Sequence, residues 1–284
     1  RIKKEVIDHS RPAGMQAFVM NVRKPVFDDV AVRRAVNYAF DYEWSNRQFA
    51  FDSYTRTNSF FENSELASSG VPEGAELALL EPYREQLPES LFEEPFVLPE
   101  TDGSGNNRTQ LREAIRILEE AGYKTGPDGI RLDPESGERL SFEILENQPA
   151  FERWTLPFIK NLKKIGIEAS FRLVDTAQYQ NRITDFDYDM TVLVIPQSLS
   201  PGNEQREFWH SSKADVSGSR NYIGIKDEVV DALVEKVISA PDREALVNAT
   251  RALDRVLLWQ YYVVPQWHLN AYRLAYWDRF GQPE

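Results

Sequence analysis

Three carboxylates at alternating positions are the residues of this chain most suggestive of catalysis. Asp185, Asp187 and Asp189 precede an apolar run, and the last two would lie on one face of a strand. Two carboxyl groups on one face can couple their ionisation and act as acid and base in a hydrolysis. A solvated turn between a helix and a strand explains the same cluster, and we favour it, with a carboxylate-dependent hydrolase as the rival.

Other catalytic and metal-binding patterns are missing from the sequence. The chain has no cysteine, which excludes a thiolate nucleophile and a Cys-ligated metal site. His9, His210 and His268 are far apart, and none has a second ligand at metal-binding spacing. No G-x-S-x-G elbow occurs, and residues 103–108 lack the third glycine of a dinucleotide-binding turn. We therefore expect no catalytic residue, no metal and no cofactor.

A binding chemistry remains, in the polar stretch of residues 197–221. Aromatic and amide side chains there can form flat apolar walls with orienting hydrogen bonds, and arginines such as Arg206 can hold a carboxylate through two bonds. The alternatives are that the aromatic side chains anchor the core and that Arg206 pairs with Glu204 or Glu207. The candidate ligand-binding residues are Gln197, Ser198, Asn203, Trp209, Arg220, Asn221 and Tyr222.

An α/β layer is predicted to position this stretch. Residues 140–145, 167–174 and 188–195 have the apolar character of strands, and a helix is predicted in each connection. Pro157 must either begin the first of these helices or kink it. The order β, α, β, α, β favours a sheet with right-handed crossovers. Ligands bind beyond the carboxyl ends of strands in such sheets, which points to the loop after Ile195.

Further helices and strands are predicted on both sides of this layer. Prolines and glutamates punctuate residues 55–107, where the periodicity weakens, so we predict a long loop with one short helix near residues 76–87 and a solvated acidic surface. Elsewhere the patterns predict strands over 14–22, 263–269 and 272–277, and a hairpin between 130–132 and 140–145. One helix is predicted to begin at Asp28 or Asp29 and another at Asp41. Further helices are predicted over 109–121, 227–240 and 242–260.

The amino-acid composition limits the size of the fold and the classes of partner. The 284 residues are 42% apolar, enough for one large domain or two smaller ones. A net charge of -12 argues against a nucleic-acid partner, which needs a basic surface. No apolar run approaches the roughly 18 to 20 residues needed to cross a bilayer. The abrupt first and last residues predict that the chain is part of a longer protein.

Three motifs bracket nearly the whole chain. They lie at residues 21–41, with Pro25-Val26-Phe27-Asp28-Asp29 at the centre, at 162–168 running on to 185–190, and at 221–225 with 230–234. Together they resemble the periplasmic dipeptide- and oligopeptide-binding family of ABC-transporter solute receptors, in its microcin- and murein-peptide branch. The likeness is weakest over residues 55–107, which would be an insertion of this branch.

This resemblance implies a non-catalytic, monomeric receptor of two lobes in the periplasm that closes on an extended peptide and delivers it to permease subunits. Residues 26–270 would form the C-terminal ligand-binding lobe. Residues 1–25 would be a strand segment leading into that lobe, and 271–284 the start of the return to an N-terminal lobe. A domain that binds protein partners through its acidic insertion is a further alternative.

The sequence departs from the family at one position of the binding site. In the family, the loop after the last parallel strand carries an aspartate that holds the free amino group of the peptide. Residues 196–201 occupy this place here and contain no carboxylate. A buried ammonium without a counter-charge is costly. Either Glu204 replaces the aspartate from further along, or the ligand is a blocked, modified or non-peptide solute.

Overall fold

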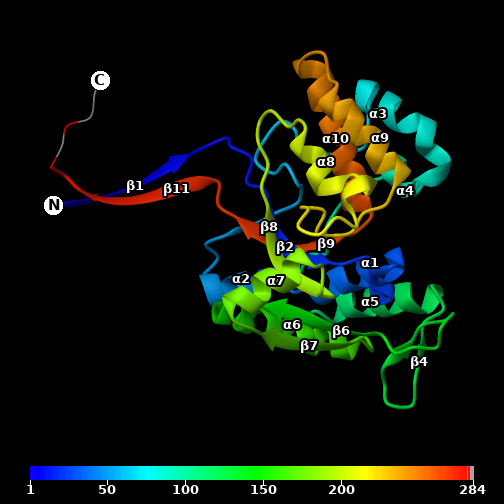
Figure 1. Ribbon diagram of the computed structural model, residues 1–284. Helices are drawn as coiled ribbons and strands as arrows, with labels where there is room; N and C mark the ends of the chain where they lie inside the picture. The colour runs from blue at the N-terminus through cyan, green and yellow to red at the C-terminus, as the bar shows by residue number, and fades with distance from the viewer. Residues whose placement is uncertain (280, 282–284) are drawn as a thin grey trace.

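A mixed sheet runs through the centre of the computed structural model, which describes residues 1–279 and Gly281 (Figure 1). Its strands, in order across the sheet, are β7 (Glu168–Leu173), β6 (Ser141–Glu146), β8 (Met190–Ile195), β2 (Met15–Met20) and β9 (Val263–Pro265). β6 is parallel to β7 and β8, whereas β2 is antiparallel to β8 and β9. The predicted α/β class with a mixed sheet flanked by helices is confirmed.

Two crossover helices connect the three parallel strands, as predicted. The aspartate before the second helix begins it, because the Asp175 carboxylate accepts hydrogen bonds from the free N–H groups of the first turn. Pro157 lies inside the first helix, after a short 3-10 turn, and does not begin it. The helices are α6 (Glu152–Lys164), which joins β6 to β7, and α7 (Thr176–Thr184), which joins β7 to β8.

The third parallel strand begins later than predicted. β8 starts at Met190 rather than Tyr188. The amide of Asn21 donates to the carbonyl oxygens of Phe186 and Tyr188, at 3.0 and 2.8 Å. Because these carbonyl groups are satisfied by a side chain, this segment forms a turn instead of extending the ladder.

One face of the sheet is covered by helices that carry a phenylalanine-rich core. The rings of Phe18, Phe40 and Phe158 lie with their centroids 5.0 to 5.6 Å apart. Asp29 and Asp41 begin the first two helices through side-chain hydrogen bonds, as predicted. The helices are α1 (Val30–Ala39), α2 (Tyr42–Ala50), α5 (Arg108–Glu120) and α6.

The opposite side of the molecule holds a second layer of helices with its own apolar core (Figure 1). Trp209 and Phe60 meet edge to face in this core, with centroids 5.1 Å apart. The predicted helices over 227–240 and 242–260 are both confirmed within two residues at their ends. The layer contains α3 (Gly74–Leu80), α4 (Ser90–Glu93), α8 (Glu204–Trp209), α9 (Glu228–Ile238) and α10 (Arg243–Trp259).

Residues 55–107 correct the prediction of a long solvated loop. Besides α3, this segment contains β3 (Thr55–Arg56), a 3-10 helix over Glu81–Gln86 and α4. Its apolar side chains are buried at irregular spacing, so no helical or strand period revealed them. Glu76 is buried too and pairs with Arg255 of α10 at 2.6 Å. The fully buried apolar residues are Phe60, Phe61, Leu66, Leu80 and Leu91.

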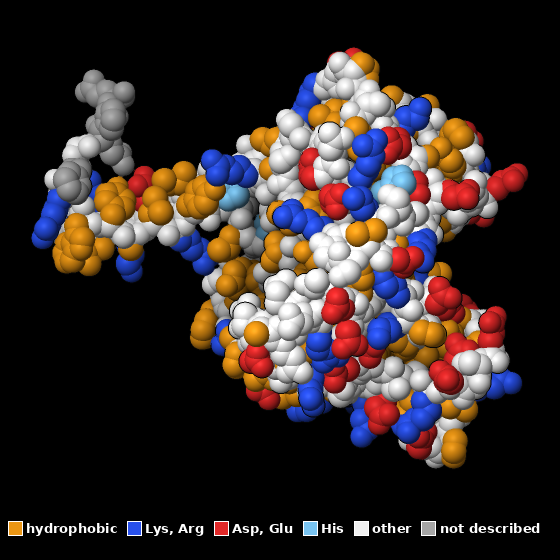
Figure 2. Space-filling model, in the orientation of Figure 1, with side chains coloured by type: hydrophobic (Ala, Val, Ile, Leu, Met, Phe, Trp, Pro, Cys, Tyr) orange, Lys and Arg blue, Asp and Glu red, His pale blue; other side chains and the backbone are white. Residues whose placement is uncertain are grey.

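An antiparallel ribbon of two strands projects from the body (Figure 1). It pairs β1 (Ile2–Asp8) with β11 (Ala271–Trp277), so the predicted strand over 272–277 is confirmed. Apolar side chains are exposed along the ribbon (Figure 2).

The predicted hairpin is formed differently. β5 (Arg131–Leu132) pairs with β4 (Lys124–Thr125), and its contact with the segment before β6 is a single bridge between Leu132 and Arg139. The tight turn of residues 126–130 brings β4 and β5 together, because the Gly126 N–H donates to the Ile130 carbonyl at 2.7 Å. The turn that the sequence predicted before β5 therefore closes a hairpin with the preceding strand.

Candidate functional site

The three parallel strands end at one edge of the sheet. Glu146 is the last residue of β6 and pairs in register with Leu173, the last residue of β7. Leu145 pairs with Thr191 of β8, so Glu146 comes abreast of Val192 one step further on. This edge is where ligands bind in open α/β sheets, and it is the edge that the sequence predicted.

Glu146 carries the least satisfied carboxyl group at this edge. Its side chain is only 2% exposed. One oxygen, Oε2, accepts a hydrogen bond from the Asn147 N–H at 3.2 Å, and the other, Oε1, has no partner. Burial raises the pKa of Glu146 to about 7, because removal from water disfavours the charged form.

Amide side chains lie on the same face of the sheet as Glu146, on the side toward β2 and β9. Glu146 alternates with Leu145 and so faces the side of Ile144 and of the α6 core. On that face Gln16 of β2 donates to Gln266 Oε1 at 3.0 Å. Gln266 is buried and its Nε2 group has no partner. The edge therefore holds both an acceptor and a donor that the described part of the chain leaves free.

Aromatic rings cluster between the start of α6 and the residue that follows Gln266 in the chain. Phe158 of α6 stacks on Phe18, and Trp154 lies one turn earlier on the same helical face, closer to the end of β6. The rings of Trp154 and Trp267 lie 4.1 Å apart between centroids, and Tyr54 stacks on Trp267 at 5.5 Å. Such rings offer flat apolar contact surface. Sequence reasoning did not include them, because Trp154 reads as one more apolar residue of a helix face.

Apolar side chains at the ends of β7 and β8 are exposed around this edge. Leu173 is 44% exposed and Val194 is 53% exposed. Val194 pairs with Gln16 in the β2–β8 ladder, so it lies in the same row as the amide groups. Exposed apolar side chains around buried polar groups are the arrangement that ligand sites use.

Two of the predicted ligand-binding residues lie where the sequence places them, just beyond β8. Gln197 accepts a hydrogen bond from Gln205 at 2.8 Å, and its own Nε2 group is buried without a partner. Ser198 is exposed and its hydroxyl accepts from the Ser200 N–H at 3.2 Å. Both side chains retain hydrogen-bonding capacity for a solute.

Trp209 and Asn221 lie in the interior instead. Trp209 is 1% exposed and its indole N–H donates to Gln205 at 2.8 Å. The Asn221 side chain is fully buried and accepts from the N–H groups of Gly224 and Ile225, both at 2.9 Å. In the described structure both residues hold neighbouring segments in place, which is the role of a core anchor.

The other predicted contacts surround α8. Asn203 is exposed at its beginning, Arg220 is exposed over the Phe208 ring, and Tyr222 is partly buried, with a carbonyl group that accepts from Tyr188 at 2.6 Å.

Arg206 corrects a further prediction, because it pairs with Glu235 of α9 at 2.6 Å and not with Glu204 or Glu207. Glu204 is exposed, and its carboxylate accepts from the Gly202 N–H at 2.9 Å. Both charged groups therefore have local partners in the second helical layer.

The aspartate cluster of the rival hydrolase is dispersed among separate partners. Asp185 accepts from Ser217 at 3.2 Å, Asp187 pairs with Arg182 at 3.1 Å, and Asp189 accepts from the Glu143 N–H at 2.9 Å. Three separately engaged carboxylates do not form the coupled pair that acid–base hydrolysis needs.

Metal-binding clusters and membrane-spanning helices are both absent from the described residues. Residues 1–279 and Gly281 contain no group of three or more His, Cys, Asp or Glu placed to hold a metal ion. In the same part of the chain no helix combines the length and apolar character needed to cross a membrane. His268 is nearly buried, and its Nδ1 lies 3.2 Å from the Thr57 hydroxyl.

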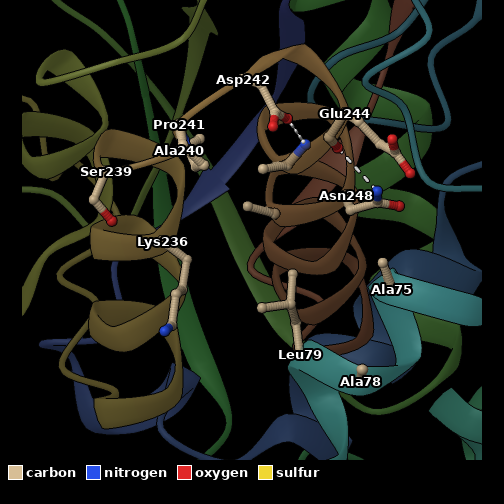
Figure 3. A pocket seen from close by; sticks show the side chains of 12 residues that line it. Ala75, Ala78, Leu79, Lys236, Ser239, Ala240, Pro241, Asp242, Glu244 and Asn248 are labelled. Atoms are coloured by element: carbon tan, nitrogen blue, oxygen red, sulfur yellow. Dashed lines mark hydrogen bonds between the residues drawn. The ribbon is translucent and has the colours of Figure 1, made fainter.

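A groove of about 560 Å³ lies away from the strand ends, between α3, α9 and α10 (Figure 3). Short side chains such as Ala75 and Ala245 form much of its wall. Asp242 accepts from the Ala245 N–H and Asn248 donates to the Glu244 carbonyl, so both polar groups are used within α10 (Figure 3). Lys236 and Glu244 line the groove with exposed charged side chains, but the groove lies away from the strand ends, where open α/β sheets bind ligands, so the strand edge is the better candidate.

The fold is shared with binding proteins of known structure. The oligopeptide-binding protein AppA of Bacillus subtilis, solved with a nonapeptide, superposes with a TM-score of 0.68 at 21% identity over 96% of this chain and 47% of its own. This likeness defines the class of the fold as that of periplasmic binding proteins.

Sequence comparison defines the family. The model of bacterial extracellular solute-binding proteins, family 5, matches residues 1–216, and the chain belongs to this family. It is 48% identical to the uncharacterized protein y4wM of Sinorhizobium fredii and 45% identical to the probable peptide-binding protein YejA of Agrobacterium fabrum, over its whole length in both cases. The chain spans less than half the length of these curated relatives, 43% and 46%.

Proposed function

We propose that the protein binds peptides or peptide-like solutes in the periplasm and delivers them to the permease subunits of an ABC importer. The observation that carries this proposal is the 45% identity, over the whole chain, to a relative named as a probable peptide-binding protein. The strand edge supports it, because free hydrogen-bonding groups and aromatic walls suit a backbone that carries amides and varied side chains. The receptor acts as a monomer without catalysis.

The arrangement of the chain supports its division into one lobe and two segments that connect this lobe to another. Residues 26–270 act as the C-terminal ligand-binding lobe, with 55–107 as a branch insertion that is packed into its core. Residues 1–25 and 271–284 lead to and from an N-terminal lobe. The paired strands β1 and β11 support this division, since they leave the body side by side (Figure 1). Residue 280 and residues 282–284 lie outside the described part of the chain.

The test uses the full-length protein. Native mass spectrometry should detect a co-purified solute, and calorimetry of the ligand-free protein should show saturable binding of a tetrapeptide pool. Gln197→Ala should weaken binding about threefold to thirtyfold, the effect of one or two hydrogen bonds. Ser239→Ala, in the groove of Figure 3, is the matched control and should bind as the wild type does. Absence of both a retained solute and peptide binding would refute the proposal.

A further inference from the structure

Glu146 is a buried carboxyl group for which the chain supplies no positive partner. No Lys, Arg or His of residues 1–279 forms an ion pair with it, its donors are backbone N–H groups of Asn147 and Gln148, and Oε1 has no hydrogen-bond partner. An ionised carboxylate without a partner loses much more in desolvation than it gains from its surroundings. Such a group stays protonated or obtains a cation from outside the chain.

Its position distinguishes Glu146 from the buried acids that hold the fold together. Glu76 pairs with Arg255, and Asp254 accepts four hydrogen bonds from residues 59–68. Glu146 instead ends a parallel strand in one row with the exposed side chain of Leu173. A carboxylate that served only the fold would gain nothing from that position.

Exposed chain begins two residues beyond Glu146. In the connection from β6 to α6, Gln148, Pro149 and Ala150 are exposed. The buried carboxyl group therefore lies next to the exposed end of its strand.

We propose that Glu146 binds a positively charged group of the solute, an ammonium or a guanidinium, through Oε1. This inference rests on the proposed function and specifies its ligand. Trp154 lies in the first turn of the helix that follows Glu146 and its ring meets that of Trp267, and indole faces attract a cation. The free Nε2 group of Gln266 donates to a carbonyl oxygen of the same solute. The ligand class is thus a peptide-like solute with a cation next to an amide.

The cation has two possible sources in a peptide, the free amino terminus and a basic side chain. Three tetrapeptide pools separate them. The first has free amino termini and no Lys or Arg, the second is N-acetylated with one Lys, and the third is N-acetylated without any basic residue. The third pool also reports whether a variant still folds and binds.

Calorimetry of the full-length wild type, Glu146→Gln and Ser239→Ala with these pools tests the inference. The wild type and Ser239→Ala should bind the first or second pool about tenfold to hundredfold more tightly than the third, the range of a charge-assisted hydrogen bond. Glu146→Gln should lose this preference and bind the third pool as the wild type does. Equal wild-type affinity for all three pools, or a preference that survives in Glu146→Gln, overturns the inference and leaves the proposed function intact.

A second measurement needs only the wild type, so it holds even if the variant fails to fold. Preference for the cationic pool should decline as the pH falls from 8 to 5, because a protonated carboxyl group cannot hold a cation. The charge of Glu146 acts on Tyr179 of α7, and burial raises the pKa of Tyr179 to about 12, so Tyr179 stays neutral throughout. A preference that does not change with pH contradicts the inference. No binding of any pool contradicts the proposed function itself.

Discussion

Two buried carboxyl groups of this chain, Glu146 and Asp254, have opposite surroundings. Asp254 of α10 accepts from the hydroxyls of Ser59 and Ser68 and from the backbone N–H groups of Phe60 and Ser68, at 2.7 to 2.9 Å. Glu146 has only backbone donors, from Asn147 and Gln148, and one free oxygen. Burial raises the pKa of both groups, to about 6 for Asp254 and about 7 for Glu146. The comparison supports the proposal that Glu146, which lacks these partners, serves a ligand, whereas Asp254 serves the fold.

The largest expected effect is on stability, at Asp254. Asp254→Asn replaces an acceptor oxygen by an NH₂ group that faces N–H and O–H donors, so at least one buried donor loses its partner. The free energy of unfolding should fall by about 3 kcal/mol, measured by urea denaturation at pH 7. An unfolding free energy of Asp254→Asn equal to that of the wild type would break the comparison.

The next effect concerns the pH dependence of stability at Glu146. A folded pKa raised from 4.5 to about 7 means that this residue's contribution to stability is present at low pH and is lost as the pH rises through 7. Relative to the wild type, Glu146→Gln should therefore gain about 2 kcal/mol between pH 5 and pH 8. Parallel stability curves for the two proteins would show that Glu146 is not buried in its neutral form.

The smallest effect is the removal of a single donor to Asp254. Ser68→Ala leaves the carboxylate with three hydrogen bonds and should cost about 1 kcal/mol of unfolding free energy. Ser217→Ala, which removes an exposed hydroxyl near Asp185, is the matched control and should leave the urea midpoint unchanged. Equal midpoints for both variants would mean that the donors to Asp254 are interchangeable with water.

Regular elements were predictable from the sequence, whereas the irregular segment and most of the site were not. Helices begun by Asp29, Asp41 and Asp175 and the alternation of parallel strands with helices depend on local hydrogen bonds and periodic burial, which short windows of sequence contain. The packing of residues 59–68 depends on Asp254, almost 200 residues away in the chain.

The site illustrates the same limit. The loop after Ile195 was predicted from topology, and Gln197 and Ser198 lie in it. The sequence could not show whether Trp209 belongs to the core or to the wall of a ligand site, because an aromatic side chain has the same character in both places. Glu146 was missed because it ends a strand as one glutamate among many, and only the structure shows that its oxygen has no partner.

The hydrogen bonds of Asp254 also bear on the order in which the molecule assembles. They connect positions separated by 186 to 195 residues, so the loop they close includes most of the chain. Closing so long a loop costs entropy before any contact repays it, and contacts of this kind form late in folding. The hydrogen bonds to the Asp254 carboxylate therefore form after the chain has collapsed. Loss of this carboxylate should accelerate unfolding while leaving the rate of folding nearly unchanged.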